Sequence, residues 1–581
     1  MSPQSTKRTY WLDILFRHIS RLPASDRTLL HIALLAFICT GIWALYAINK
    51  DSLITTPGQG GTLVEGIIGI PRFVNPVLAN TRADRDVTAL IYRGLMKIAP
   101  TGELVPDAAE SITLSDDGTT YTIRLRSDVR FHDTTPLTAR DVAFTIGLLQ
   151  DPELKSPYRG SWVDVTVELV SEYELKITLK EPYAPFVENF TVGILPAHLW
   201  STLPLEQIPF SQLNTEPIGA GDFRIARATR DTSGIITTYE LAAVQSALGD
   251  PNISTIRLRF YPNEAAIVNA LNSDSITSTS YLEPSHLPLL TSDASISITT
   301  IPLPRLYTVF FNENRSAIVR DSSVRKALTA AIDRSALIEK TRSGFGVPTF
   351  TPTTLSFPNV ESEGNRDDTS PTSSTTTPAD ILRAGGWSKT DAGVWEKRID
   401  GETELLSLTI KTSNQEIFQT MAETLAAAWR AIGVEVTIEQ YEQSGLVQSV
   451  IRPRDFTVLL FGIDHNRSQD LYPFWHSSQK DDPGLNISQY TNLKVDELLE
   501  TARVTEDQTA RRTLLAEASS LIRNEAPAIF LFQPTQIHIA KDTVVMTSIT
   551  DINHPADRFM NVADWYVREE QLWPILNNRT Q

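Results

Sequence analysis

Hydrophobic residues recur along this 581-residue chain in patterns that predict several kinds of element. Residues 29–48 form an unbroken apolar run in which only His31 is strongly polar. A helix of that length spans roughly 30 Å, the thickness of a bilayer core. Residues 121–125 alternate apolar and polar side chains, which predicts a half-buried strand. Residues 418–432 carry an apolar stripe with helical spacing. Beyond the apolar run, the pattern therefore predicts an α/β protein.

The segment after the strand at 121–125 predicts a turn and then a capped helix. Residues 132–136, His-Asp-Thr-Thr-Pro, are typical of a turn. Thr138 is placed to cap the helix, and Asp141 completes a capping-box-like start. The apolar side chains that follow lie on one helical face: Val142, Ile146 and Leu149.

A parallel βαβ unit is predicted in the second half of the chain. Apolar and polar residues alternate at 406–410 and again at 434–438, on either side of the helix at 418–432. Gly433 ends that helix and leaves a short connection, as in a parallel unit. Residues 458–462 are continuously apolar, as expected for a strand inside a covered sheet.

The charges around the apolar run predict which side of a membrane holds the bulk of the chain. Lys50 is the one basic residue close behind the run. The basic residues before it are more numerous: Lys7, Arg8, Arg17, Arg21 and Arg27. The positive-inside rule therefore predicts a single-pass protein of the cell membrane with a cytoplasmic N-terminus. Residues 51–581 are expected outside the cytoplasm, in the periplasm or at the cell surface.

Two other interpretations of the apolar run are a cleaved signal peptide and a lipoprotein. A cleaved signal peptide normally has a shorter apolar core and a small-x-small site directly after it, and neither feature is present. A lipoprotein needs small residues before its cysteine, whereas Phe37 and Ile38 precede Cys39. An uncleaved membrane anchor is the reading that the sequence favours.

Composition and motifs exclude several classes of function. The net charge of −17 argues against a nucleic-acid partner, because phosphate binding requires clustered Lys and Arg. The single cysteine, Cys39, excludes an internal disulfide and a cysteine-based zinc site. No HExxH, GxSxG or P-loop pattern occurs, and the nine histidines are scattered. We therefore expect a protein that is not an enzyme, with no catalytic residues, metal site or cofactor.

Several blocks resemble one known family. Residues 131–142, Phe-His-Asp-Thr-Thr-Pro-Leu-Thr-Ala-Arg-Asp-Val, resemble the signature region of the family 5 solute-binding proteins. These are the extracytoplasmic peptide-binding components of bacterial ABC importers. The match has one extra residue before the acid, and Thr134 stands where glycine is usual. Residues 324–334 resemble a second family block and residues 217–223 a third. The resemblance covers about residues 61–566.

The resemblance implies a two-lobed, periplasmic binding protein-like type II fold of α/β class. It has hinged lobes and an extra domain in the first lobe, and here one N-terminal transmembrane helix precedes it. The implied limits are a cytoplasmic tail at 1–28, a transmembrane helix at 29–48, a linker at 49–60, lobe 1 at 61–302 with an inserted subdomain at about 86–211, lobe 2 at 303–523, and a return to lobe 1 at 524–581. Residues 55–61 are expected to be a flexible spacer, and residues 361–378 a disordered surface excursion.

The candidate binding residues follow the buried strand at 458–462, where open α/β sheets commonly meet ligands. In peptide-binding relatives an acidic residue of the matching loop pairs with the α-amine of the peptide. Asp464 and Asp470 are the candidates for that role, and Trp475 and His476 are candidates for the cleft lining. The alternative is that Trp475 is a core residue and that the aspartates cap turns. Ile463 stands where the family often has tryptophan.

The function implied by the resemblance is a membrane-anchored receptor that binds peptides between its lobes. It would deliver them as a monomer to the permease subunits of an ABC importer. Other family members take nickel chelates, haem or oligosaccharides, so a different solute is an alternative. A surface sensor that kept the fold without transport is a reading from another class, and a hydrolase is a more distant one.

Overall fold

The structure of the chain is a computed structural model. It describes residue 18 and residues 23–52, 54–291, 296–354, 377–465, 467–541, 544–547 and 552–572. The chain divides into two compact units, residues 1–58 with 568–581, and residues 59–567. The disordered excursion predicted at 361–378 falls outside the described residues except at its end. There, Thr377 forms a capping box for helix α11 (Pro378–Ala384).

The first unit contains the apolar helix α2 (Ala24–Ser52), which includes the predicted span at 29–48. Within it, Ala24–Ala47 is a candidate membrane span with a mean hydropathy of 2.1. Cys39 is exposed on this helix. The helix is long and apolar enough to cross a membrane, a property that signal sequences near an N-terminus share.

Part of the predicted flexible spacer is a strand. Strand β1 (Ile54–Pro57) pairs antiparallel with β23 (Glu569–Leu572), and Gly58 N–H donates to the carbonyl of Arg568 at 2.8 Å. Pairing satisfies backbone groups that a free linker would leave to water. The partner strand comes from the far end of the chain, so the composition of the spacer alone did not reveal it.

A twelve-stranded mixed sheet organises the second unit. Its main order is β20-β19-β21-β14-β22-β12-β2-β11-β10-β9, and β13 and β15 also pair with β22. The strands are β2 (Thr62–Ile68), β9 (Phe223–Arg230), β10 (Ile236–Ala243), β11 (Thr255–Tyr261), β12 (Ser278–Thr279), β13 (Ile296–Pro302), β14 (Arg305–Phe311), β15 (Gly346–Pro348), β19 (Ser407–Ser413), β20 (Glu435–Tyr441), β21 (Val458–Asp464) and β22 (Ala528–Lys541).

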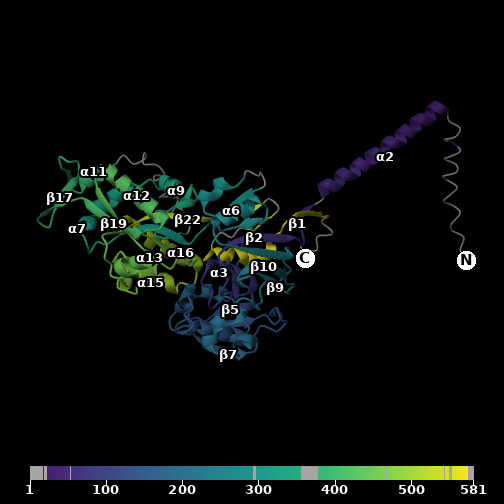
Figure 1. Cartoon of the computed structure of the whole chain (residues 1–581), viewed down its shortest axis with the longest axis horizontal. Helices are drawn as coiled ribbons and strands as arrows, with labels where there is room; N and C mark the ends of the chain where they lie inside the picture. The colour runs from purple at the N-terminus through teal and green to yellow at the C-terminus, as the bar shows by residue number, and fades with distance from the viewer. Residues whose placement is uncertain are drawn as a thin grey trace. The chain divides into compact units, whose positions relative to one another are not determined.

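Strand β22 joins two halves of this unit. Residues 528–532 pair with β14, and residues 535–541 pair with β13. The chain also crosses between the halves at Leu303 and Pro304, from β13 to β14. Each half has its own buried apolar clusters, and Figure 1 shows the half with α12 and α15 beside the half with α3 and β10. The second unit therefore consists of two halves that share one mixed α/β sheet.

The chain passes between the halves at two places. The first crossing lies at residues 303–304, between β13 and β14. The second lies inside β22, because Ile529, Leu531 and Phe532 still pack in the core of the second half.

A separate four-stranded antiparallel sheet lies within the insertion expected at about 86–211. Its order is β5 (Ala109–Leu114), β6 (Thr120–Leu125), β8 (Glu174–Thr178) and β7 (Thr166–Ser171). It is the part around the labels β5 and β7 in Figure 1. Its apolar side chains belong to the same core cluster as those of β2 and α3 (Arg82–Ile91). The sheet follows α3 in the chain.

The strand, turn and capped helix predicted at 121–149 are confirmed. The inward residues of β6, Tyr121, Ile123 and Leu125, are buried. Helix α4 (Ala139–Gln150) starts with a Thr138–Asp141 capping box. Its predicted stripe of Val142, Ile146 and Leu149 is buried.

The predicted βαβ unit is also confirmed. Strands β19 and β20 are parallel and are connected through α12 (Glu416–Ala431), and β21 lies beside β19 with most of its side chains buried. The remaining elements of the first half are β3 (Met96–Ile98), β4 (Leu104–Pro106), η1 (Arg159–Ser161), η2 (Ala184–Thr191), α5 (Ala197–Trp200), η3 (Leu205–Phe210), η4 (Gln212–Asn214), α6 (Glu264–Asn272), η5 (Pro284–Leu289) and η8 (Pro555–Asp564). Those of the second half are α7 (Ala317–Arg320), α8 (Ser322–Ala330), α9 (Arg334–Arg342), β16 (Ser388–Lys389), β17 (Trp395–Ile399), β18 (Glu402–Leu405), α13 (Gln443–Leu446), η6 (Val447–Ile451), α14 (Tyr472–Trp475), η7 (Ser477–Gln479), α15 (Leu493–Val504) and α16 (Gln508–Glu525).

Replacing Asp141 should destabilise the first half, because its buried carboxylate serves two elements. It accepts from Thr138 N–H and from Ala197 N–H, each at 2.8 Å. We expect Asp141→Ala to lower the free energy of unfolding by about 2 kcal/mol, through loss of the cap and of a buried hydrogen bond. Urea unfolding followed by circular dichroism measures this loss. The exposed Asp128→Ala is the control, expected to change stability by about 0.5 kcal/mol or less. Equal effects of the two variants would contradict the assignment.

Candidate functional site

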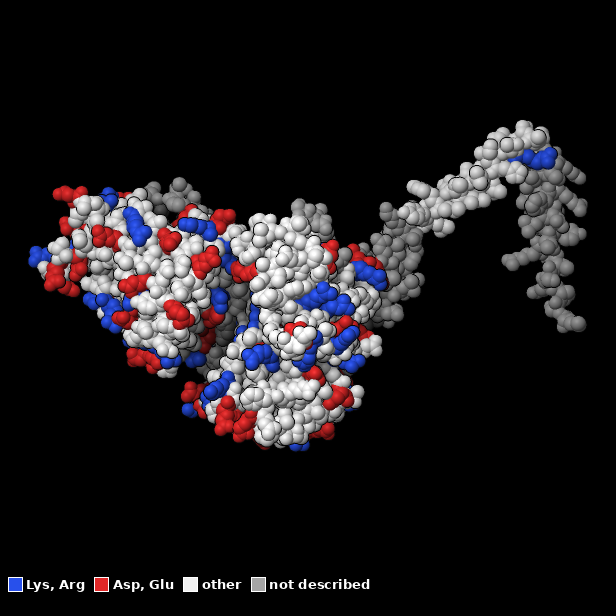
Figure 2. All heavy atoms as spheres, in the orientation of Figure 1, with Lys and Arg blue, Asp and Glu red and all other residues white. Residues whose placement is uncertain are grey.

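A cavity of about 1000 Å³ is lined by both halves of the second unit. This volume is at the upper end of the range of about 300–1,000 Å³ typical of small-ligand sites. Most of its wall belongs to the first half and to η8. The second half contributes the ends of β14 and β21 and one side chain of α15: Arg305, Asp464, His465 and Arg503. Figure 2 shows Lys, Arg, Asp and Glu interspersed over the face of the second unit in view, without a field of a single sign.

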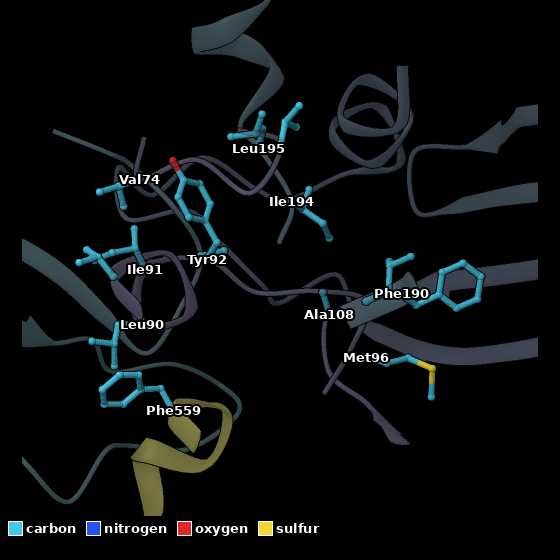
Figure 3. Packing of buried hydrophobic residues seen from close by; sticks show 14 of the residues in the cluster. Val74, Leu90, Ile91, Tyr92, Met96, Ala108, Phe190, Ile194, Leu195 and Phe559 are labelled. Atoms are coloured by element: carbon cyan, nitrogen blue, oxygen red, sulfur yellow. The ribbon is translucent and has the colours of Figure 1, made fainter. Parts of the chain in front are cut away.

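Helix α3 supplies one wall of the cavity because its start is firmly fixed. Thr81 and Asp84 form a capping box, and Asp84 Oδ1 also accepts from Arg72 N–H at 2.7 Å and from Phe73 N–H at 2.9 Å. The side chains at helical spacing on one face then line the cavity: Arg82, Arg85, Ala89 and Tyr92. The other face packs in the core, where Leu90 lies beside Phe559 of η8 (Figure 3).

Arg93 anchors the wall next to α3. Its guanidinium forms ion pairs with Asp107 and with Asp222, the latter at 2.5 Å, and its Nε donates to the carbonyl of Ala220 at 2.9 Å. These two carboxylates raise the pKa of Arg93 against the opposing effect of burial. A buried charge is tolerable when it is paired in this way.

The glycine block at 217–223 packs against the end of α3. A Cβ on Gly219 would lie 2.1 Å from the carbonyl oxygen of Ile91, so no other residue fits there. The block therefore has a structural role at the end of α3, and Gly221 also lines the cavity.

Asp464 lies at the rim contributed by the second half. It is the cross-strand partner of Arg305, and the two side chains form a bidentate ion pair at 2.6 and 2.9 Å. Hydrogen bonding to Asp464 raises the pKa of Arg305. The Asp464 side chain is 64% exposed, so it is accessible to a ligand from the cavity.

Asp470 lies behind the wall instead of on it. Its carboxylate accepts from the hydroxyl of Tyr183 at 3.0 Å and from Arg503 Nε at 3.1 Å, and both donors line the cavity. Tyr183 belongs to the first half and Arg503 to the second. Asp470 thus positions two lining side chains and links the halves through a buried charge.

A second polar link joins the halves close to Asp470. Arg467 is paired with Glu188 of the first half at 3.4 Å, donates to the carbonyl of Gly102, and through its backbone N–H binds Asn553 Oδ1 at 2.6 Å. Burial raises the pKa of Glu188, and Arg467 opposes that rise. The loop after β21 therefore binds the first half along one side of the cavity.

Trp475 and His476 lie away from the cavity. Trp475 is fully buried in a core cluster of the second half, between Phe310 and Phe530. The His476 ring stacks on Tyr472 at 4.0 Å and binds Glu500 at 3.1 Å. Neither residue is among those that line the cavity. Trp475 is thus a core residue, which is the alternative to a cleft-lining role. The short helix α14 turns its large apolar side chain inward.

The structure reveals lining residues that the sequence analysis did not select. They are mainly aromatic and basic: Arg82, Arg85, Tyr158, Trp162, Tyr183 and Arg503. The signal for Arg82 and Arg85 is their spacing with Ala89 and Tyr92 on one face of α3. Tyr158 and Arg503 carried no such signal, because unrelated loops and helices bring them to the wall. Within the described part of the chain, no group of His, Cys, Asp and Glu is arranged to hold a metal ion.

The chain is similar in sequence and fold to known proteins. Residues 103–484, more than half of the chain, match the family model of bacterial extracellular solute-binding proteins, family 5 Middle. Oligopeptide-binding protein AppA of Bacillus subtilis (strain 168) is 26% identical over 557 residues, which cover 93% of this chain and 97% of AppA. The structure of B. subtilis AppA in complex with a nonapeptide has a TM-score of 0.61 and 24% identity, over 88% of this chain and 100% of AppA. NikZ from Campylobacter jejuni in complex with Ni(L-His) has a TM-score of 0.63 and 22% identity, over 87% of this chain and 99% of NikZ.

The buried ring of His465 predicts a loss of stability in mild acid. Burial lowers its pKa from 6.5 to about 4, and neither ring nitrogen has a hydrogen-bond partner among the residues that the structure describes. Below pH 6.5 the unfolded chain takes up a proton here, whereas the folded chain does not until about pH 4. Stability therefore falls as pH decreases through this window, by at most about 1.4 kcal/mol per pH unit from this residue.

Replacing His465 with Phe tests this prediction, since phenylalanine fills similar space beside Phe474 but does not titrate. Urea midpoints between pH 6.5 and pH 4.5 should decrease less steeply in the variant than in the wild type. The difference between the two proteins at pH 8, where both side chains are neutral, gives the packing effect alone. If the urea midpoints of the two proteins decreased equally steeply with falling pH, His465 would be protonated in the folded protein, and the prediction would be wrong.

Proposed function

Because this chain belongs to the bacterial extracellular solute-binding proteins of family 5, we propose that it is a membrane-anchored receptor for peptides. The family is made up of substrate-binding proteins, so the chain is a binding protein by class. Within that class, the peptide ligand, the retained anchor, the monomeric state and delivery to an ABC permease are our proposals. The observation that carries them is the cavity between the halves, which offers aromatic faces and charges of both signs to a zwitterionic ligand.

The polarity of the cavity supports a ligand with a free amine. Asp464 is an accessible carboxylate at the end of a buried strand, where an incoming ammonium group would find a partner. Burial between closing halves strengthens such a pair relative to one on an open surface. Asp470 supports the same wall indirectly through Tyr183 and Arg503.

A different solute is the second candidate, favoured by one comparison. The NikZ structure, similar in fold, holds Ni(L-His). A chelate of that kind also carries carboxylates and would use the basic side chains of the wall. A sensor with the same fold and no transport role is distinguished by its genetic context, because an importer receptor needs a permease and ATPases.

Helix α2 supports retention as an anchor through its length and its basic flank. It continues to Ser52, and strand β1 follows almost directly.

Mass spectrometry of the protein purified from membranes tests the anchor and the ligand together. We expect an intact mass that includes the N-terminal residues, and heterogeneous short peptides released on denaturation. A shortened chain would contradict the anchor, and a single sugar or metal chelate would contradict the peptide ligand.

Replacing both Asp464 and Asp470 with Asn should weaken binding of peptides that have a free N-terminus. We expect a loss of about tenfold in affinity, typical of one charge-assisted contact, with the larger share from Asp464. Calorimetry with a peptide and its N-acetylated form measures the effect. The variant should no longer distinguish the two forms.

The matched control for this pair is Asp455→Asn. Asp455 is an exposed aspartate of the same half, paired with Lys411 and outside the cavity lining. It should leave both affinities unchanged. Retained discrimination between the free and acetylated peptides in the double variant would remove both aspartates from amine recognition.

A further inference from the structure

One outward face of the sheet in the first half is basic, although the chain as a whole is acidic. The face is formed by β9, β10 and β11, and β9 is the last strand at that end of the sheet. The inward residues of these strands, such as Tyr239, Leu241 and Leu258, are fully buried in the core. The outward residues alternate with them along each strand. Four of the outward residues are arginines: Arg224, Arg227, Arg257 and Arg259.

The register of the strands brings these arginines together. Arg227 and Arg257 lie on either side of Glu240, because both are its cross-strand partners. Residues three apart on a regular strand point to opposite faces. A register shift between β9 and β10 adds one residue to β9 between Arg224 and Arg227, so both share the outward face. Arg259 follows two residues after Arg257 on the same face.

Most of this positive charge has no acidic partner in the protein. Glu240 is the one carboxylate among the outward residues of the three strands, and it pairs with Arg257 at 3.2 Å. Within the described part of the chain, no carboxylate lies within 4.0 Å of the guanidinium groups of Arg224, Arg227 and Arg259. Arg224 and Arg227 are exposed, and Arg259 is half-buried. The face therefore presents an excess of accessible positive charge.

This face belongs to the part of the second unit that follows the apolar helix most closely in the chain. Helix α2 ends at Ser52, and β2 begins at Thr62, which pairs with Thr255 at the start of β11. The intervening segment of about ten residues spans at most about 35 Å when fully extended. With α2 retained in a membrane, this segment keeps the basic face within reach of the lipid headgroups.

Anionic phospholipids match this face in charge and in chemistry. Guanidinium groups form paired, charge-assisted hydrogen bonds with phosphate oxygens. Such attraction acts over about one Debye length, roughly 8 Å at physiological salt, so it requires that the face stays close to the membrane. A covalent tether supplies that closeness as a high effective concentration. The net charge of −17 means that the rest of the surface is repelled by the same lipids, so the attraction favours one orientation.

We propose that the outward face of β9, β10 and β11 docks on anionic phospholipid headgroups of the membrane that holds α2. Its contacts are Arg224, Arg227, Arg257 and Arg259. The inference goes beyond the proposed function and rests on one part of it, the retained anchor, and not on the identity of the ligand. Docking holds the first half at the membrane in one orientation, and the second half takes no part in the contact.

Energy transfer in lipid nanodiscs tests the docking with the full chain. Cys39→Ser removes the single cysteine, and Thr229→Cys then places one donor dye on the outward face of β9. A second protein carries the donor through Thr403→Cys, at an exposed position on β18 of the second half. The acceptor dye is attached to lipid headgroups. The discs contain either phosphatidylcholine alone or phosphatidylcholine mixed with the anionic phosphatidylglycerol.

We expect transfer from position 229 to rise when the anionic lipid is present, and transfer from position 403 to stay unchanged. Raising the salt to about 1 M, which shortens the Debye length to about 3 Å, should abolish the rise. This salt dependence is measured on the protein with its arginines intact, so it does not depend on how any arginine variant folds.

Removing the unpaired arginines should also abolish the rise. The triple variant is Arg224→Gln, Arg227→Gln and Arg259→Gln, and it leaves the pair of Arg257 with Glu240 in place. Circular dichroism should show an unchanged fold, because these side chains lie on the surface.

The matched control removes the same charge from the second half. It combines Arg320→Gln, Arg398→Gln and Arg512→Gln, three exposed arginines outside the basic face. Transfer from position 229 in anionic discs should rise in this control as it does with the arginines intact. Loss of the rise in the control would show that net charge alone is responsible, and would overturn the docking face.

Three further results would overturn the docking while the anchored receptor stands: equal transfer from position 229 in both kinds of disc, a rise preserved in the triple variant, or an equal rise at position 403. An acidic protein partner in place of lipid would give the first of these, because the discs contain no other protein. Failure of the chain to co-migrate with the discs would overturn the anchor itself, and the docking with it.

Discussion

Strand β22 is the constraint on which the two-half arrangement depends. It is 14 residues long and buried along nearly its whole length, first within the core of one half and then within the other. Its backbone pairs with β14 at one end and with β12 and β13 at the other. A central strand of this kind cannot slip by one residue without turning its buried side chains to the wrong face. The halves therefore share a fixed register at the crossing, and the cavity forms to one side of it.

Buried charges near β22 show how the first-half wall is held. Arg558 of η8 pairs with Asp86 of α3 at 2.7 Å and with Glu65 of β2 at 3.2 Å, and all three side chains are almost fully buried. Burial raises the pKa of Glu65, and Arg558 opposes that rise. The network ties η8, α3 and β2 together. Removing one member would leave an uncompensated charge, which costs far more than the pair itself contributes.

Helix α3 has two roles, because different side chains of the same helix serve the buried network and the cavity wall. Asp84 and Asp86 are occupied by backbone groups and by Arg558, so they stabilise the protein. Arg82 and Arg85 line the cavity instead.

Local patterns in the sequence were sufficient for the elements whose causes are local. The alternation in β6, the Thr138–Asp141 capping box and the parallel unit around α12 all depend on residues within a few turns of each other, and all are as predicted. The family also followed from such short blocks. Only the tertiary structure decided that Asp464 is at the rim, that Asp470 is behind the wall, and that Trp475 is in the core. It also decided the pairing of β1 with β23 and the meeting of Tyr158, Arg85 and Arg503 at one cavity, because these contacts join segments far apart in the chain, and no local period encodes them.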